Sequence, residues 1–177
     1  MKFERAPLEG AWVIEVDPSA DPRGWFARTF CLEEFAAHGI DMRVAQANAS
    51  FNLRAGTLRG MHYQAPPHGE RKVVRCTRGA IYDVIVDVRP VSATYLRWFA
   101  AELTADNGRM LYVPEGFAHG FQTLVEASEV SYLMSRAYVS EAAQGLRWDD
   151  PALAIEWPPV AERTISERDR RHPVLSS

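Results

Sequence analysis

Short β-branched and aromatic runs, each ended by a glycine or proline turn, follow one another from residue 11 to about residue 138. The clearest runs are Ala11–Asp17, Lys72–Thr77, Ala80–Val88, Tyr95–Leu103, Met110–Val113, Phe117–Leu124 and Val130–Met134. Strands at a spacing of roughly 8–12 residues with turns between them are typical of a sandwich or barrel. A short helix is expected at Leu32–His38, where Gly39 ends the helical spacing. The pattern predicts an all-β fold with short helices.

The length of the chain fits one domain, because domains typically contain roughly 100–200 residues. Hydrophobic residues make up 47% of the 177 residues and charged residues 24%, which is enough apolar surface for one core. No internal repeat or long linker divides the sequence. The segment from about residue 140 to residue 177 is less regular and rich in proline and charge. We therefore expect a single domain over residues 1–177, with this last segment as a tail that wraps or caps the barrel.

Charge and cysteine usage narrow the classes of function. The net charge of −3 and the pI of about 6.0 give no basic field for nucleic acid. The sequence starts without an apolar signal region, and no apolar run approaches the length of a membrane span. Cys31 and Cys76 lie far apart and outside a CxxC spacing, so free thiols in a reducing compartment are expected. These features predict a soluble, cytoplasmic protein with a small-molecule ligand and no nucleic-acid or membrane partner.

The segment Gly56–Gln64 combines strand-like residues with two groups that suit chemistry, Arg59 and His62. On a flat strand these two side chains would point to opposite faces, because side chains alternate. A β-bulge at Gly60 would turn both into one cavity. His119, between small residues after a turn, and Tyr132, on a late strand, are further candidates. Each of these signals is weak alone, since a histidine or tyrosine in a strand commonly packs in the core.

Other site chemistries leave different patterns. Small β-barrels that bind Fe, Mn or Zn usually carry two histidines two residues apart, whereas Gly60 and Gln64 flank His62 at that distance. A metal site built from His62, His119 and a distant carboxylate remains an alternative. The sequence contains no G-x-S-x-G, G-x-G-x-x-G or G-x-x-x-x-G-K motif. The motifs of a serine nucleophile, a Rossmann site and a P-loop are therefore absent.

Taken together, these segments resemble the dTDP-4-dehydrorhamnose 3,5-epimerase family over about residues 10–173. The matching blocks are Asp21-x-Arg23-Gly24-x-Phe26, Gln46-x-Asn48-x-Ser50, Gly56-x-Leu58-Arg59-Gly60-x-His62-Tyr63-Gln64, Lys72, Asp83-x-x-x-Asp87-x-Arg89, Pro114-x-Gly116-Phe117-Ala118-His119-Gly120-Phe121, Tyr132, Tyr138, Asp149-Asp150-Pro151, Ile155-x-Trp157-Pro158 and Ser166-x-x-Asp169. Any one block could match by chance, but their order and spacing together are highly specific for this family.

The resemblance implies a cupin-type jelly-roll β-barrel that forms a homodimer, in which N-terminal strands cross to the partner and help to line its site. It also implies an isomerase that inverts C3, C5 or both in a nucleotide-linked 4-keto-6-deoxyhexose, of the dTDP-4-dehydro-6-deoxy-D-glucose type. Such enzymes belong to dTDP-rhamnose biosynthesis and need neither a metal nor an organic cofactor. A metal-dependent cupin, a C3- or C5-only epimerase and a non-catalytic sugar-nucleotide-binding cupin are the alternatives.

The resemblance also implies catalytic roles. His62 would be the base, with an unperturbed pKa of ~6.5 close to working pH. Tyr132 would be the acid on the other side of the sugar ring. Asp169 would hold the tautomer of the imidazole, and Lys72 would place positive charge near the developing oxyanion. The substrate's C4 ketone acidifies the hydrogens on C3 and C5, so these groups suit the reaction.

The implied substrate-binding residues form a larger set. Its members are Arg23, Phe26, Gln46, Asn48, Arg59, His119, Tyr138 and Arg168. Arg23 and Arg59 would bind the diphosphate. The sequence departs from the family at two substrate-contacting positions, where Arg28 and Ala143 replace a common glutamate, and the loop between Asn48 and Gly56 is expected to be one residue longer. The nucleotide, the sugar and the inverted carbons are therefore left open.

Overall fold

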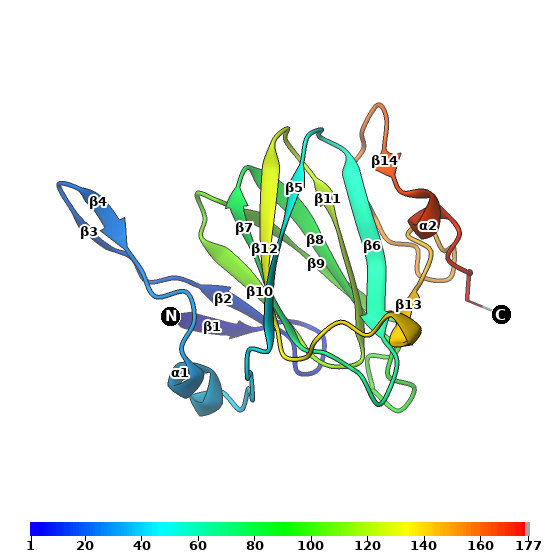
Figure 1. The fold of residues 1–177 in the computed structure, drawn as a ribbon, viewed down its shortest axis with the longest axis horizontal. Helices are drawn as coiled ribbons and strands as arrows, with labels where there is room; N and C mark the ends of the chain where they lie inside the picture. Colours follow the sequence, from blue (N-terminus) through cyan, green and yellow to red (C-terminus); the bar gives the residue numbers. More distant parts are fainter. Residues whose placement is uncertain (176–177) are drawn as a thin grey trace.

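Two antiparallel β-sheets enclose the core in a computed structural model that describes residues 1–175 (Figure 1). The strands of the first sheet are, in order across it, β1 (Lys2–Arg5), β2 (Trp12–Glu15), β10 (Arg109–Val113), β7 (Lys72–Arg78), β12 (Ser128–Met134) and β5 (Gln46–Asn52). Because β7, β10 and β12 alternate along the chain with strands of the second sheet, the chain crosses repeatedly between the sheets.

The second sheet carries one wall of the functional site. Its strands are, in order, β13 (Ala143–Gly145), β6 (Thr57–Gln64), β11 (Phe117–Thr123), β8 (Ala80–Asp87) and β9 (Trp98–Thr104). A two-residue strand, β14 (Thr164–Ile165), pairs parallel to β6. The predicted all-β, cupin-type jelly roll is confirmed by this arrangement.

The core lies between the two sheets, where alternate side chains of each strand point inward. Val74 and Leu111 from the first sheet meet Ile85 and Phe121 from the second, and all four are buried. Removing a side chain of this size from water stabilises the fold by about 1.5–3 kcal/mol. The tail adds a second layer, since Leu146 and other tail residues pack on the outer face of the second sheet.

Short helices lie outside the sheets. The helix α1 (Leu32–Ala37) packs through Phe35 against the outer face of the first sheet. A 3-10 turn, η1 (Ser140–Ala142), precedes β13, and α2 (Glu167–Arg170) lies beside β6. Among residues 1–175, no helix has both the length and the apolar character needed to span a membrane.

The hairpin of β3 (Ser19–Asp21) and β4 (Gly24–Phe26) forms its own two-stranded sheet and projects away from the barrel (Figure 1). Trp25 and Phe26 on β4 are 57% and 79% exposed. The hairpin therefore carries apolar surface that lies outside the core of the barrel.

The predicted strands and the observed strands differ mainly at their ends. The run predicted at Ala11–Asp17 is a strand only over Trp12–Glu15, and the run predicted at Tyr95–Leu103 begins at Trp98. The loop predicted between Asn48 and Gly56 is wrong in its first half, because β5 continues to Asn52. The sequence of β5 is mostly polar, since this edge strand borders the open site rather than the core.

Candidate active site

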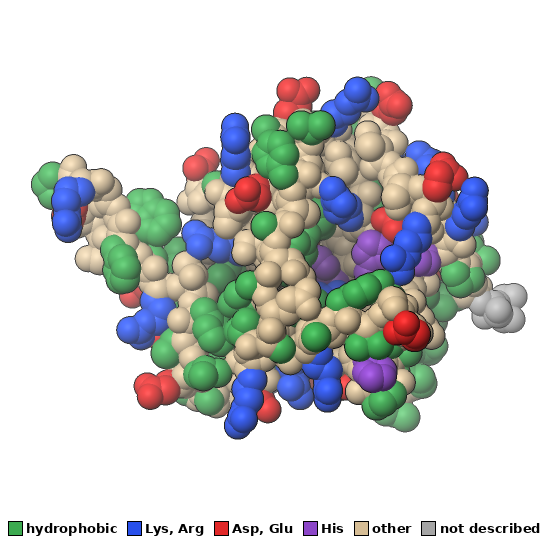
Figure 2. All heavy atoms as spheres, viewed as in Figure 1, with side chains coloured by type: hydrophobic (Ala, Val, Ile, Leu, Met, Phe, Trp, Pro, Cys, Tyr) green, Lys and Arg blue, Asp and Glu red, His purple; other side chains and the backbone are tan. Residues whose placement is uncertain are grey.

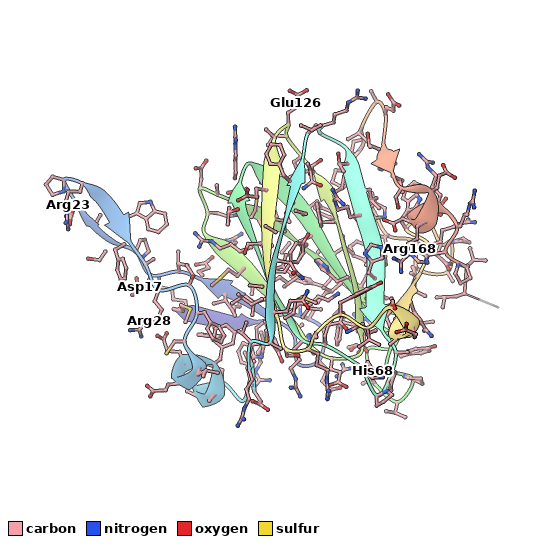
Figure 3. All side chains as sticks on the ribbon, viewed as in Figure 1. Asp17, Arg23, Arg28, His68, Glu126 and Arg168 are labelled. Atoms are coloured by element: carbon pink, nitrogen blue, oxygen red, sulfur yellow. The ribbon has the colours of Figure 1, made fainter. Side chains whose placement is uncertain are left out.

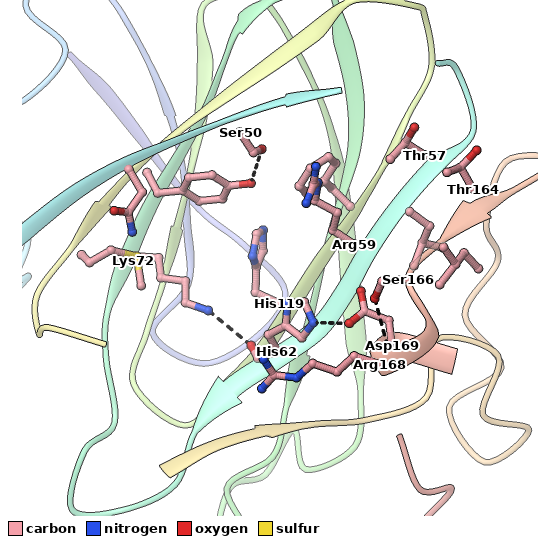
Figure 4. A pocket seen from close by; sticks show the side chains of 16 residues that line it. Ser50, Thr57, Arg59, His62, Lys72, His119, Thr164, Ser166, Arg168 and Asp169 are labelled. Atoms are coloured by element: carbon pink, nitrogen blue, oxygen red, sulfur yellow. Dashed lines mark hydrogen bonds and ion pairs between the residues drawn. The ribbon is translucent and has the colours of Figure 1, made fainter. Parts of the chain in front are cut away.

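A cavity of about 590 Å³ opens between the two sheets and is lined by β5, β6, β7, β11, β12, β14 and α2 (Figure 4). Its lining residues are Asn48, Ser50, Thr57, Leu58, Arg59, His62, Lys72, His119, Phe121, Tyr132, Met134, Thr164, Ile165, Ser166, Arg168 and Asp169. The surface is visibly hollowed here, with histidine inside the hollow and basic side chains beside it (Figure 2). Ligand pockets typically measure about 300–1,000 Å³, so the cavity has the size of a small-molecule site.

A β-bulge at Gly60 brings Arg59 and His62 to this cavity, as the sequence predicts. His62 lies opposite His119 and Arg59 lies opposite Phe121, so β6 has two residues between these pairs where β11 has one. Gly60 has a φ of +136°, and a Cβ there would lie 2.5 Å from the Cα of Gly120. Only glycine fits this close approach of two backbones.

Asp169 is the hydrogen-bond partner of His62. The Nε2 atom of His62 lies 2.8 Å from Oδ1 of Asp169, and the backbone N–H of Gly60 donates to Oδ2 at 3.1 Å. Ser166, the N-cap of α2, accepts a hydrogen bond from the Asp169 backbone N–H at 3.1 Å and fixes the turn. Burial would raise the pKa of Asp169, but the hydrogen bonds from His62, Gly60 and Ser166 hold that pKa below its ordinary value.

This pairing sets the protonation of the imidazole. An ionised carboxylate can only accept hydrogen bonds, so Nε2 of His62 must donate its hydrogen to Asp169. The lone pair of the neutral ring is therefore on Nδ1. A neutral imidazole held in one tautomer by a carboxylate is arranged as a general base.

Tyr132 stands on β12, in the sheet opposite His62. Its hydroxyl lies 3.1 Å from Oγ of Ser50, and its ring lies edge-on to His119 with 6.2 Å between centroids. Burial raises the pKa of Tyr132 well above the ordinary value of a phenol. The hydroxyl therefore stays protonated at neutral pH and can donate a proton into the cavity.

Lys72 is a buried cation in the cavity wall. Its Nζ donates to the backbone oxygen of His62 at 3.3 Å and pairs with Oε1 of Glu70 at 3.1 Å. The Glu70 side chain is 5% exposed, and its Oε2 has no hydrogen-bond partner among the described residues. Glu70 is a partner of Lys72 that the sequence analysis missed, and it lies two residues before Lys72, just outside β7.

His119 is held by a second buried carboxylate. Its Nε2 lies 2.8 Å from Oδ1 of Asp83, and both side chains are almost completely buried. Burial raises the pKa of Asp83. Asp83 lies among the mostly apolar residues of β8, and a buried carboxylate in that position is a signal for a polar contact.

Two arginines bring positive charge to the cavity (Figure 4). Arg59 lies on the strand β6 and Arg168 lies on the helix α2. The Nε of Arg59 donates to Oδ1 of Asn52 at 2.7 Å, which holds the guanidinium in place. Arginine presents a planar fork of donors that suits phosphate oxygens. The cavity can therefore bind a ligand with a negatively charged end.

Four residues of the predicted substrate-binding set do not line the cavity within one chain. Arg23 and Phe26 lie on the projecting hairpin, far from Arg168 at the cavity (Figure 3), and Arg23 forms an exposed ion pair with Asp21. Gln46 is the first residue of β5, where its side-chain amide donates to Oδ1 of Asn48 at 2.9 Å. Its Oε1 accepts a hydrogen bond from the backbone N–H of Tyr138 at 3.2 Å.

The two positions that depart from the family also lie outside the cavity lining. Arg28 forms an ion pair with Glu34 at 2.8 Å, near α1. Ala143 is opposite Gln64 in the pairing of β13 with β6, at the edge of the second sheet. Within one chain, Ala143 therefore lies at the edge of the sheet that carries His62, whereas Arg28 lies far from Arg168 and the cavity (Figure 3).

The metal alternative named His62, His119 and a carboxylate, and the structure places these groups differently. Among residues 1–175, the three potential ligands that converge are His62, Asp169 and His172. His119 is paired with Asp83 instead. His172 is a further residue that the sequence analysis missed, and no motif in the sequence marks it.

The family model described as dTDP-4-dehydrorhamnose 3,5-epimerase matches residues 5–177. The chain belongs to this family. A dTDP-4-dehydrorhamnose 3,5-epimerase of Sinorhizobium fredii is 42% identical over 175 residues, which are 99% of this chain and 90% of the relative. A dTDP-4-dehydrorhamnose 3-epimerase of Streptomyces niveus is 39% identical over 171 residues, or 96% of this chain and 82% of the relative.

The fold of the family is also found in solved structures. The crystal structure of dTDP-4-dehydrorhamnose 3,5-epimerase from Bacillus anthracis, with TDP and PPi bound, superposes with a TM-score of 0.95 at 38% identity. The match covers 98% of this chain and 99% of that chain. This chain is therefore an isomerase of the dTDP-4-dehydrorhamnose 3,5-epimerase type.

Proposed function

We propose that this epimerase inverts both C3 and C5 of dTDP-4-dehydro-6-deoxy-D-glucose by proton transfer between His62, the sugar and Tyr132. The observation that supports this most directly is the position of the two groups on opposite sheets of one cavity (Figure 4). Inversion requires removal of a proton from one face of the sugar and its return to the other face. A single residue on one side of the ring would return the proton to the face it left.

The first step is removal of the proton on C3 or C5 by Nδ1 of His62. The electron pair of the C–H bond moves toward the C4 ketone and forms an enolate. Asp169 stabilises the imidazolium that results, because its ionised carboxylate already holds Nε2. A positioned base of this kind contributes about 10²–10⁴-fold to the rate.

Lys72 is the group proposed to stabilise the enolate oxygen. It is buried and held by two hydrogen-bond acceptors, so its charge is already in place before the reaction. A preorganised donor at a developing oxyanion is typically worth about 3–4 kcal/mol. His119, fixed by Asp83, and Asn48 border the same part of the cavity and would orient the sugar.

The second step is protonation of the enolate carbon by the hydroxyl of Tyr132 from the opposite face. The bond from oxygen to hydrogen breaks and the new C–H bond forms with inverted configuration. Ser50 is within 3.1 Å of the phenol oxygen and can stabilise the phenolate. Solvent then restores the proton on Tyr132 and removes the one on His62, so the enzyme returns to its starting state without a cofactor.

The negatively charged diphosphate is proposed to bind between Arg59 and Arg168, which leaves the thymidine toward the cavity mouth. Arg23 and Phe26 belong to this proposal through a second copy of the chain. Their hairpin projects from the barrel and exposes Trp25 and Phe26, so it can reach the cavity mouth of a partner in a homodimer. The expected location of the enzyme is the cytoplasm, where nucleotide sugars are made.

The decisive experiment is incubation of the protein with dTDP-4-dehydro-6-deoxy-D-glucose in deuterated water, with NMR detection of the sugar. We expect deuterium at both C3 and C5 and a sugar with the L-rhamno configuration. Deuterium and inversion at C3 alone would show a 3-epimerase, the activity of the Streptomyces niveus relative. No exchange at either carbon would refute the proposed reaction.

A further inference from the structure

His62, Asp169 and His172 present three potential metal-ligand atoms that all lie within 4.8 Å of one another. Oδ1 of Asp169 is 2.8 Å from Nε2 of His62 and 3.8 Å from Nε2 of His172. In a tetrahedral zinc site with bonds of about 2.0–2.2 Å, ligand atoms are about 3.3–3.6 Å apart. The two separations from Oδ1 lie on both sides of this range, and all three ligand atoms lie within 4.8 Å of one another, so rotations of the side chains would bring them to one ion.

His172 has no part in the proposed reaction, and its environment is unusual. Its Nε2 atom is buried and has no hydrogen-bond partner among residues 1–175. The ring packs edge-on to His62 with 5.7 Å between centroids. It also lies against Gly145, where any Cβ would collide with the imidazole, so the glycine makes room for this ring. A buried imidazole nitrogen without a partner is unfavourable unless a ligand uses it.

Asp169 is already oriented as a metal ligand. Its Oδ2 accepts the hydrogen bond from the backbone of Gly60, so Oδ1 is left facing both histidines. Outer hydrogen bonds of this kind fix ligands in known metal sites. Two imidazoles and one carboxylate are the donor set of open zinc sites, in which the fourth position is free. This donor set disfavours Ca²⁺ and Mg²⁺, because those ions need several carboxylates or other oxygen ligands.

We propose that His62, Asp169 and His172 bind Zn²⁺ and that the ion inhibits the enzyme. The metal would take the place of the hydrogen bond between His62 and Asp169. When Nε2 of a neutral imidazole binds a metal, the ring carries its hydrogen on Nδ1. The lone pair that removes the substrate proton would then be lost, and the proton that leaves Nε2 is balanced by the one that Nδ1 gains. Zinc binding itself does not depend on the proposed function, whereas the inhibition rests on it.

Binding is tested first on the metal-free full-length protein without substrate. Co²⁺ is titrated as a spectroscopic substitute for Zn²⁺, and Zn²⁺ affinity is measured by competition with a chromophoric chelator. We expect one ion per chain, a visible absorption band of tetrahedral Co²⁺, and loss of that band when Zn²⁺ is added. His172→Gln should weaken binding by more than about tenfold, since even outer-shell partners account for about 10- to 100-fold in metal affinity.

His68→Gln is the matched control, because His68 is a partly exposed histidine away from the cavity (Figure 3). It should bind metal like the wild type. His62→Gln removes another of the three proposed zinc ligands and should also weaken metal binding. This second variant keeps the test valid if the His172 variant folds poorly. The absence of a tetrahedral Co²⁺ spectrum, or equal affinity in wild type and both ligand variants, would overturn the site.

Inhibition is tested by epimerisation at increasing free Zn²⁺. Wild type and His68→Gln should lose activity as the measured fraction of bound metal rises. His172→Gln should be active without metal and should need more than about tenfold higher Zn²⁺ for the same loss. Zinc-loaded wild type with undiminished turnover would overturn the inhibitory role. If no variant turns over the sugar even without metal, the proposed reaction fails, while the Co²⁺ result still decides the metal site.

Discussion

At the scale of single residues, His62 and its partner Asp169 are separated by 107 positions in the chain. The sequence around His62 is informative, because the glycine between Arg59 and His62 predicts the bulge that turns both into one cavity. No local pattern connects Asp169 to it, and only the family resemblance assigned that partner. Glu70 pairs with Lys72, and His172 packs against His62. Neither residue was predicted, because both lie in irregular segments, where no periodic pattern marks a contact.

The role of His62 predicts the effect of removing its imidazole. His62→Ala should abolish deuterium exchange at C3 and C5, because a general base contributes about 10²–10⁴-fold. Binding of the nucleotide sugar should change by only a few fold, since the base adds little to ground-state affinity. NMR exchange and calorimetric titration measure the two effects. His68→Ala is the control, and turnover in His62→Ala that equals this control would remove His62 from the mechanism.

Removing the acid should have a different effect on the reaction from removing the base. Tyr132→Phe should keep measurable deuterium exchange, because His62 still removes the proton. The inverted sugar should nevertheless be mostly lost, since protonation from the far face is left to water. The ring is retained, so packing should change little. Exchange and product configuration are read from one NMR series, and inversion at the wild-type rate would transfer the role to another donor, with Tyr138 the next to test.

At the scale of elements, the strands that build the core were predicted best. Ala80–Val88 and Phe117–Leu124 agree with β8 and β11 to within one residue at each end. Their β-branched residues and the phenylalanines of β11 are mostly buried, so the core requires the pattern that the sequence displays. The polar edge strand β5 was predicted as loop over its second half, because its residues face the open cavity and solvent.

The bulge in β6 predicts a strong effect of adding one methyl group at Gly60. In Gly60→Ala the new Cβ would meet the Cα of Gly120 at 2.5 Å, so β6 and β11 must separate. Gly39→Ala is the control, because Gly39 also has a positive φ but has nothing within 4 Å of its Cβ position. Gly60→Ala should lose about 1–3 kcal/mol more of the free energy of unfolding than the control.

Denaturant unfolding measures this difference between the two glycine variants. The epimerisation rate of Gly60→Ala should fall by more than its loss of folded protein explains, because a displacement of about 1 Å at reacting groups can cost about 100-fold in rate. Equal stability and equal activity in the two variants would show that the strands accommodate the methyl group without moving the site.

The turn after β8 predicts a dependence of stability on pH. Asp87 is buried, which alone would raise its pKa, but hydrogen bonds from Arg89, Ser92 and Thr94 lower that pKa to about 2. A carboxyl whose pKa is lower in the folded state stabilises the fold above its unfolded pKa and loses that contribution as the pH falls through the folded pKa. The lowered pKa corresponds to about 2 kcal/mol at neutral pH.

Asp87→Asn should therefore unfold more easily than wild type at pH 7, by about 2 kcal/mol. The difference in the free energy of unfolding between the two proteins should be constant above about pH 5, and it should decrease as the pH falls from about 4 toward 2. Denaturant titrations of both proteins across this range give the comparison. A gap that does not change with pH would mean that the carboxylate acts through its shape rather than through its charge.

At the scale of the whole molecule, the two sheets enclose the cavity that contains His62, whereas the hairpin of β3 and β4 lies outside the barrel (Figure 1). Composition and periodicity say nothing of this hairpin, because its apolar residues would satisfy a core pattern equally well. The resemblance alone assigned Arg23 and Phe26 to a substrate site. Their distance from the cavity in one chain, together with the exposure of Trp25 and Phe26, is what makes exchange between two copies a specific prediction.

Subunit mixing tests that exchange directly. His62→Ala removes the base from the chain that owns the cavity, and the double variant Arg23→Ala with Phe26→Ala removes the hairpin contacts. If the hairpin serves the partner's cavity, a mixed dimer has one cavity with both defects and one with none. Random exchange of two such populations in a two-fold dimer should therefore restore about one quarter of the wild-type sites. If the hairpin served its own chain, every cavity would carry a defect and activity would not rise above that of the parents. Sedimentation of each parent establishes that both are dimers before mixing, and activity that stays at the parental level in proven mixed dimers would contradict the exchange.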